Sequence, residues 1–232
     1  MSSKNVIFTL VILFVGYCSA QTGFENRPIT NNVAMPTAHT LNKGEFQIGL
    51  GPLAFGVSDK IQIGSNVLTF LLGSPNANAR VKLLDNSIHN VAAGVGVGQT
   101  RTKLYGQDAT YISWYPFIAY SRPLSPTTQF HASLNLSAFM GDDGVQDAEP
   151  QDFWRGTSAD AGVEYSYSNR TKFLLDGGYD FTFRGARVGG AVLWGWKTFR
   201  LKLGVAYYNP KGRTNAFISP ILGFWWRFGG RD

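Results

Sequence analysis

After residue 20 the chain contains no cysteine and no long apolar run. Its only cysteine is Cys18. This position excludes a disulfide framework and a thiolate metal site from the rest of the chain. A membrane-spanning helix needs ~20 consecutive apolar residues, and no stretch after residue 20 supplies them. A disulfide scaffold and a helical membrane protein are therefore both excluded.

Charge is also scarce, at 16% of the residues, and the basic excess is modest, with a formal net charge of +6. The basic residues are scattered singly and form no stripe, which argues against nucleic acid as a partner. The three histidines are spread along the chain. The acidic residues in 141–156 lack the ordered spacing of a calcium-binding loop. We therefore expect no metal and no cofactor, and an acidic lipid headgroup or an anionic solute as the electrostatic partner.

The first twenty residues have the pattern of a secretory signal peptide. Lys4 precedes an apolar core at residues 6–16, and small residues lead up to Ala20. About ten apolar residues are too few to span a bilayer. We expect cleavage after Ala20; the alternative is a lipoprotein signal built on Cys18, which Tyr17 disfavours because that motif has a small residue there. Residues 21–232 then form a single domain, a length suited to one all-β unit.

Alternation of apolar and polar residues dominates the remaining chain. Successive strand residues point to opposite faces of a sheet, and the run from Phe199 to Tyr207 sets Arg200 and Lys202 opposite its apolar face. The mean hydropathy of −0.08 hides this pattern because the two phases cancel. Soluble sandwiches alternate too. Many of these strands, however, reach the ~9–11 residues of a tilted membrane-crossing strand and carry Tyr, Trp or Phe near their ends, which is typical of a membrane interface.

One alternating run contains Gly94, Gly96 and Gly98. It is superficially like a phosphate-binding fingerprint, but the spacing of a third glycine and a following helix are missing. We interpret these glycines as room for bulky neighbours inside a curved sheet.

The last apolar segment, residues 216–228, has one continuously apolar face that becomes aromatic toward its end. It resembles the closing strand of bacterial outer-membrane β-barrels, which ends in an aromatic residue read by the barrel-assembly machinery, although a tail follows Phe228 here. Residues 37–45 and 56–64 are similar to segments of uncharacterised, transporter-like bacterial barrel families. The resemblance implies an outer-membrane location in a Gram-negative bacterium, and outer-membrane lipid and the assembly machinery as partners. It also implies an assembly signal at Phe224, Trp226 and Phe228.

The alternation of short turns with longer loops predicts an all-β fold, a closed up-and-down antiparallel transmembrane β-barrel. Eleven candidate strands follow residue 44, and the first and the closing one are both expected to run from the outside to the periplasm. Because such barrels have an even number of strands, we predict a further strand within residues 30–41, paired with the closing strand, which gives twelve. Ten strands is the alternative if residues 60–70 and 79–84 do not form independent spanning strands.

The inward-facing phase of the predicted strands carries the charges that bear on function. In a narrow barrel such charges pair into a network that closes the interior; in a wider one they line a pore and bias its selectivity. An excess of basic residues favours anions weakly. The candidate lumen-lining residues are Glu45, Arg80, Lys82, Asp160, Glu164, Lys172, Asp176, Asp180, Arg187, Arg200, Lys202 and Arg227.

His131 and Ser133 have the spacing of the H-x-S element of outer-membrane lipid hydrolases. A Ser–His pair needs hydrogen-bond reach and a third orienting group. By phase both side chains face the lumen, and His131 lies near the periplasmic start of its strand. Those hydrolases instead act at the outer leaflet through their membrane-facing surface. We therefore assign no catalytic residues and expect a protein that is not an enzyme.

Three functions remain open at this stage. The first is a small passive channel for small solutes with a mixed-charge, slightly basic lumen. The second is a closed structural barrel that acts through its outer loops, above all residues 141–156. The third is a lipid-modifying enzyme that depends on His131 and Ser133. Fold alone does not decide among them.

Overall fold

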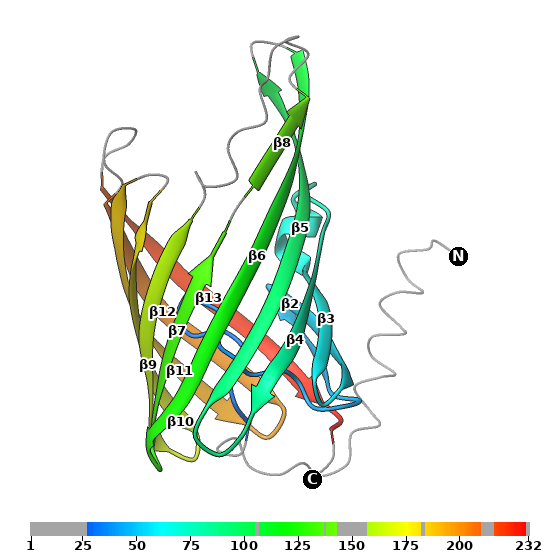
Figure 1. Cartoon of the computed structure of the whole chain (residues 1–232). Helices are drawn as coiled ribbons and strands as arrows, with labels where there is room; N and C mark the ends of the chain where they lie inside the picture. Colours follow the sequence, from blue (N-terminus) through cyan, green and yellow to red (C-terminus); the bar gives the residue numbers. More distant parts are fainter. Residues whose placement is uncertain are drawn as a thin grey trace.

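The chain folds into one antiparallel sheet that closes on itself as a barrel (Figure 1). The computed structural model describes residues 27–104, 107–136, 138–142, 157–181, 184–209 and 216–230. The predicted signal peptide, residues 1–20, and nearly all of the acidic segment 141–156 lie outside the described residues. The strands are β1 (Phe46–Leu50), β2 (Pro52–Ser58), β3 (Ile61–Asn66), β4 (Asn76–Asp85), β5 (Asn90–Leu104), β6 (Gln107–Ser125), β7 (Thr128–Asn135), β8 (Ala138–Asp142), β9 (Ser158–Ser168), β10 (Thr171–Asp180), β11 (Gly185–Trp196), β12 (Phe199–Asn209) and β13 (Phe217–Phe228).

These segments form a ring of twelve wall strands. Strands that follow one another along the chain pair, except at β8, which pairs with β6 while β7 pairs with β9. β1 joins β13 from the pair Phe46 and Phe228 to the pair Leu50 and Phe224. β7 and β8 both pair with β6, one beyond the other, so they occupy a single position in the wall. The predicted closed, up-and-down, antiparallel all-β barrel of twelve strands is confirmed. The alternative of ten is wrong, because β3 and β4, its two doubtful segments, both lie in the wall.

The prediction of a further strand within residues 30–41 is wrong, because this segment lies inside the barrel. The twelfth strand comes from residues 46–58, which reverse direction to form the β1–β2 hairpin. The reversal occurs at Gly51, whose φ of +113° is a conformation that glycine adopts readily. β1 therefore runs antiparallel to β13, and the expected common direction of the first and closing strands is also wrong.

Between β3 and β4 the chain forms one short helix, α2 (Val67–Leu71). Asn66 caps it, since its side-chain oxygen accepts a hydrogen bond from Thr69 N at 3.1 Å. Val67 N donates to Gly51 O at 2.7 Å, so the helix sits on the β1–β2 turn. Across the residues that the structure describes, no helix is both long and apolar enough to cross a membrane.

The two faces of the wall differ in chemistry, as the alternation predicts. In β13 the outward side chain of Leu222 is 59% exposed, whereas Gly223 and Arg227, which point inward, are buried. The same contrast appears in β10, where Lys172 and Asp176 are buried. The wall therefore presents an apolar outer surface and a polar inner one.

Gly94 makes room for a large neighbour on the inner face. A Cβ at this position would lie 2.4 Å from Cζ of Phe117 and 2.7 Å from the Ala79 carbonyl oxygen. The Phe117 ring therefore crosses the glycine, and the Arg80 guanidinium lies over that ring at 5.0 Å from its centroid. The interpretation of the glycine run is confirmed at Gly94, while at Gly96 the nearest atom would be 3.5 Å away.

Candidate functional site: a lumen occupied by the inner segment

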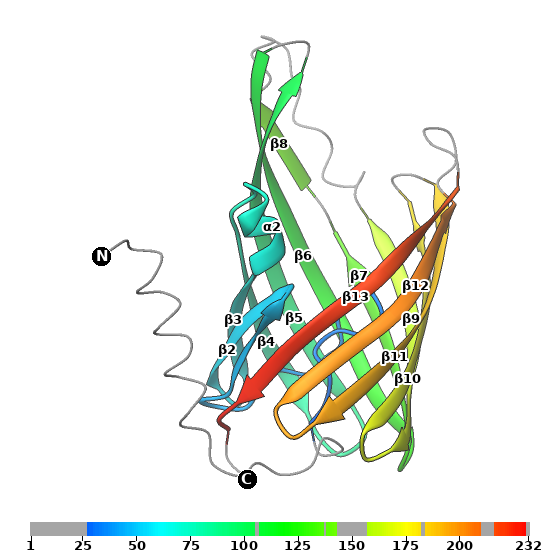
Figure 2. The same cartoon turned by 180° about the vertical axis from the view of Figure 1, so that it is seen from behind.

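Residues 27–41 run inside the barrel (Figure 2). Together with the exposed residues 42–44, which lead into β1, they are here called the inner segment. The segment folds back on itself: Asn32 N donates to Met35 O at 2.9 Å, and Thr37 N donates to Thr30 O at 3.0 Å. Met35 is fully buried. With its prolines, asparagines and threonines, the segment satisfies its backbone through turns and side chains. Part of the lumen is thus filled by the chain itself.

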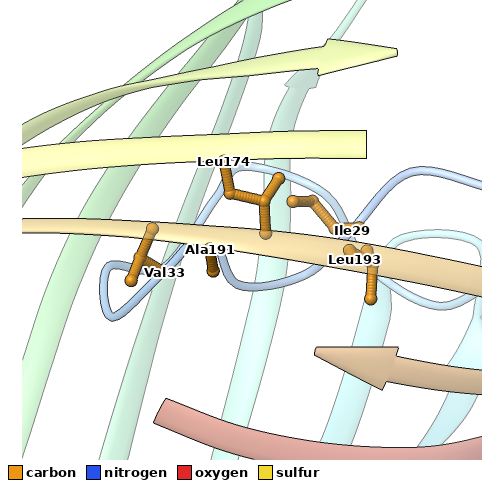
Figure 3. Packing of buried hydrophobic residues seen from close by; sticks show 5 residues of the cluster. All are labelled: Ile29, Val33, Leu174, Ala191 and Leu193. Atoms are coloured by element: carbon orange, nitrogen blue, oxygen red, sulfur yellow. The ribbon is translucent and has the colours of Figure 1, made fainter. Parts of the chain in front are cut away.

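An apolar cluster holds one side of the inner segment. Ile29 and Val33 pack against Leu174 of β10 and against Ala191 and Leu193 of β11 (Figure 3). All five are at most 7% exposed. Because burial of a large apolar side chain stabilises by roughly 1.5–3 kcal/mol, these contacts are a substantial part of what keeps the inner segment in place.

Glu45 joins the inner segment to the seam between β1 and β13. Its buried carboxylate accepts hydrogen bonds from Arg27 Nη1 at 2.7 Å and from Arg227 Nε and Nη2 at 2.7 and 2.9 Å. Arg227 also donates to Pro28 O at 2.8 Å. One carboxylate therefore binds both the last strand of the barrel and the start of the inner segment.

Arg80 binds the inner segment from β4. Its guanidinium donates to the carbonyl oxygens of Thr30 at 2.7 Å, Thr37 at 3.1 Å and His39 at 2.8 Å. It also donates to Asn31 Oδ1 at 3.3 Å. All four acceptors are neutral, so these bonds satisfy the donors of a buried cation and leave its charge in place.

The turn of the inner segment is held by two wall residues of opposite charge. Asp176 of β10 accepts hydrogen bonds from Ala34 N at 2.8 Å and Met35 N at 3.2 Å. Lys202 of β12 donates to Asn32 O at 2.8 Å. The carboxylate meets amide donors and the ammonium meets a carbonyl acceptor, so each charge is matched to the end of a peptide dipole that it attracts.

A buried polar cluster from four strands fixes the inner segment at Ala38. His131 Nδ1 lies 2.8 Å from Ser121 Oγ, which accepts a hydrogen bond from Ala38 N at 2.9 Å. Glu164 forms an ion pair with Lys172 and places Oε2 at 3.6 Å from His131 Nε2. The imidazole is fully buried. The arrangement is that of an anchor for the inner segment.

The H-x-S spacing does not make His131 and Ser133 a pair. His131 bonds to Ser121 of the neighbouring strand instead. Ser133 Oγ accepts a hydrogen bond from Asn135 Nδ2 at 3.3 Å. A serine on the adjacent strand is reached only through the strand register, which the spacing along the chain does not reveal.

Most of the predicted lumen residues lie against or beneath the inner segment. Five of these predicted residues form hydrogen bonds with it: Glu45, Arg80, Asp176, Lys202 and Arg227. Glu164 and Lys172 belong to the cluster beneath Ala38. Arg187 and Asp160 form an ion pair at 2.6 Å. Arg200, Lys82 and Asp180 lie toward the ends of their strands. Their role as the lining of an open pore stays a prediction.

Sequence reasoning missed the uncharged members of this site. Gln62 Oε1 accepts a hydrogen bond from Leu41 N at 3.0 Å, and Ser121 and Asn32 have the contacts described above. The sequence signal for Gln62 and Ser121 is their position in the inward phase of a strand. The signal for Asn32 is its position in a polar segment without alternation. Charge alone does not mark the inward residues that hold the inner segment, because uncharged side chains such as Gln62 and Ser121 bond to it as well.

A cavity of about 350 Å³ remains between the inner segment and the wall, beside the β1–β2 turn. Arg80, Lys202 and Arg227 line it, together with Trp225 of β13. None of its described lining residues is Asp or Glu. The residual space in the lumen therefore carries positive charge.

No family model and no curated protein matches the chain. Solved structures do: KdgM porin, alone and in complex with disordered oligogalacturonate, matches with a TM-score of 0.53 at 9% identity, over 80% of this chain and 97% of that one. The fold is that of a bacterial outer-membrane β-barrel. The outer membrane channel DcaP of Acinetobacter baumannii matches this barrel with a TM-score of 0.36 at 13% identity, over 90% of this chain and 69% of that one, which is too weak to carry an argument. At these identities the likeness shows architecture alone.

Proposed function

We propose that this barrel is a passive channel for small solutes in the outer membrane of a Gram-negative bacterium. The observation that carries the proposal is the cavity of about 350 Å³ beside the inner segment, in a barrel with a polar inner face. A polar interior beneath an apolar outer band is the arrangement of porins. KdgM, which shares the architecture, is described as a porin.

In this proposal the inner segment narrows the channel and the cationic lining sets a weak preference for anions. Up to residue 43, the described contacts that hold the segment are mainly side-chain hydrogen bonds and an apolar cluster; its last residue, Gly44, forms a backbone hydrogen bond with Gly56 of β2. It is therefore the part of the lumen that can be displaced without opening the sheet. A lining with basic residues attracts anions, and salt screens the attraction.

Planar-bilayer recordings of the purified, folded protein test the proposal. We expect small stepwise conductances with a weak anion preference, and larger steps in the variant Asp176→Asn, which weakens the acceptor for Ala34 N and Met35 N. Asp85→Asn is the matched control, because Asp85 pairs with Lys82 near a short turn. A barrel that folds but never conducts, in any of the three forms, would exclude a channel.

One observation favours a closed structural barrel as the second candidate: the inner segment occupies the lumen. Such a barrel would act through its outer loops. It predicts no conductance in any form, and loss of partner binding with intact folding when residues 141–156 are deleted. The bilayer experiment therefore separates the two candidates directly.

A further inference from the structure

The barrel wall is low on one side. β1 pairs with β13 only as far as Leu50 and Phe224. Above that point, among the residues that the structure describes, no strand pairs with this edge of β13 over residues 217–223. Figure 2 shows β13 rising well past the short β1–β2 hairpin. A strand edge at membrane depth needs partners for its polar groups, so this is where the wall is open to a ligand.

The cavity inside the barrel reaches this low side. It is lined by Gly51 and Pro52 of the β1–β2 turn, by Asn66 at the end of β3, and by Leu222 of β13. Leu222 is an outward side chain, 59% exposed. A cavity that contacts both the inner segment and an outward residue leads from the lumen toward the outer face of the wall.

The inner end of the cavity is cationic. Arg80 and Lys202 line it, and the hydrogen bonds described above join them to neutral oxygens of the inner segment. Arg227 shares its carboxylate partner with Arg27. Asp176, which does not line the cavity, attracts Lys202 in part. The hydrogen bonds of Arg80 go to neutral oxygens, which satisfy its donors without cancelling its charge, so the cavity favours an anionic group.

A second hollow lies on the outer face next to the low side. It measures about 550 Å³ and is lined mainly by apolar side chains, among them Phe55, Ile63, Val95 and Trp114. Four residues line both this hollow and the inner cavity: Leu53, Ala54, Ser65 and Asn78. These residues belong to the paired strands β2, β3 and β4, so the two hollows lie on opposite faces of the same part of the wall. Leu53 and Ser65 are one pair below the end of the β2–β3 ladder at Pro52 and Asn66, which both line the inner cavity, so a flexible chain passes from one hollow to the other over this rim.

We propose that the two hollows form one binding site for a single-chain anionic amphiphile, a long-chain carboxylate. The carboxylate binds in the cavity toward Arg80 and Lys202, and the acyl chain lies in the outer hollow, where the membrane surrounds it. Sites of about 300–1,000 Å³ hold small molecules, and the cavity of about 350 Å³ accommodates a head and the first carbons of one chain. The inference goes beyond passage of solutes along the barrel axis, because this ligand arrives from the side.

Quenching of Trp225 fluorescence tests the site. Trp225 lines the inner cavity, and bromine next to a carboxylate quenches an indole that it contacts. The full chain in neutral detergent micelles is titrated with 2-bromopalmitate, and the signal of a Trp225→Phe variant is subtracted. We expect saturable quenching that palmitate reverses by competition. The methyl ester of 2-bromopalmitate has no charge, and 2-bromobutyrate has no long chain. Each is expected to bind at least about tenfold more weakly than 2-bromopalmitate.

Two variants with matched controls locate the head and the chain. Lys202→Gln removes a charge from the cavity, and Ala79→Phe fills the outer hollow without touching the lumen; each is expected to weaken binding about tenfold. Lys82→Gln and Val205→Phe, which lie outside both hollows, are expected to leave binding within about twofold. Circular dichroism and heat-modifiable migration show that each variant is folded.

Three results would overturn the proposal. The first is the absence of a saturable component from Trp225 in the folded protein. The second is that 2-bromobutyrate binds as tightly as 2-bromopalmitate, which would make the cavity a site for small anions alone. The third is that the methyl ester binds as tightly as 2-bromopalmitate, which would mean that the acyl chain only partitions into an apolar surface and the carboxylate is not recognised. None of these depends on conductance, so failure here and failure of the channel proposal are distinguishable.

Discussion

Arg227 binds Glu45 through two hydrogen bonds, from Nε to Oε1 at 2.7 Å and from Nη2 to Oε2 at 2.9 Å. The pair crosses the seam at which the last strand meets the first. Since Glu45 also accepts a hydrogen bond from Arg27 at 2.7 Å, the same carboxylate closes the barrel and fixes the entrance of the inner segment.

We predict that Glu45→Gln lowers the free energy of unfolding by about 3–5 kcal/mol, because two buried guanidinium groups lose their charged partner. Urea unfolding in lipid vesicles, followed by tryptophan fluorescence, measures the change. Asp85→Asn is the control: Asp85 pairs with Lys82, and its side chain is 49% exposed. The expected cost there is about 0–1 kcal/mol. Equal effects of the two substitutions would show that the buried group does not hold the seam.

The Gly94 and Gly96 positions make a matched pair on one strand. We predict that Gly94→Ala is clearly destabilising, because its Cβ would meet the Ala79 carbonyl oxygen at 2.7 Å and displace the Phe117 ring. A cost of about 1–3 kcal/mol is expected for overpacking of this kind. Gly96→Ala, with 3.5 Å to its nearest atom, is expected to be close to neutral. Thermal unfolding of both variants decides the matter, and similar midpoints would contradict the packing argument.

His39 gives the inner segment a pH dependence. It belongs to that segment and not to a spanning strand, and its Nε2 lies 2.9 Å from Gln129 Oε1. Burial lowers the pKa of His39 from 6.5 to about 4. Between these values the released segment binds more protons than the docked one, so docking weakens as the pH falls through this window and stays constant below it.

The expected outcome is a rise in protease sensitivity of the inner segment as the pH is lowered from 6.5 toward about 4. The measurement is limited proteolysis of the folded barrel in micelles with a protease active over that range. His39→Gln keeps a polar side chain but does not titrate, and is expected to lose this part of the rise. An unchanged profile in that variant would assign the pH dependence to other groups.

Phe228 ends β13 opposite Phe46, where the barrel closes. From the resemblance of the C-terminal segment to closing strands of outer-membrane barrels, we predict that Phe228→Ala reduces insertion into the outer membrane. Fractionation of cells and heat-modifiable migration of the membrane fraction measure this. Phe217→Ala, at the other end of the same strand, is the control and is expected to insert normally. Normal insertion of both variants would remove the C-terminal aromatic residue as an assembly signal.

The sequence contains a signal for the β1–β2 hairpin that supplies the twelfth strand. The apolar phase changes between Leu50 and Leu53, which belong to opposite parities, and glycine and proline stand between them. In a strand such a change of phase turns the apolar face over. The β1–β2 reversal at Gly51 was therefore visible in principle, but each apolar run is only a few residues long, and a single strand accounted for both.

The sequence by itself determined the class of the barrel and the two faces of its wall. Alternation with a period of two is a local property, so it assigns Lys172 and Asp176 to the inside without any knowledge of their partners. Only the tertiary structure decided what fills that inside. The contact between Ala34 and Asp176 joins residues 142 positions apart, and it depends on closure of the ring. The low side of the wall has the same origin, since the reach of β1 against β13 is set by register between the two ends of the chain.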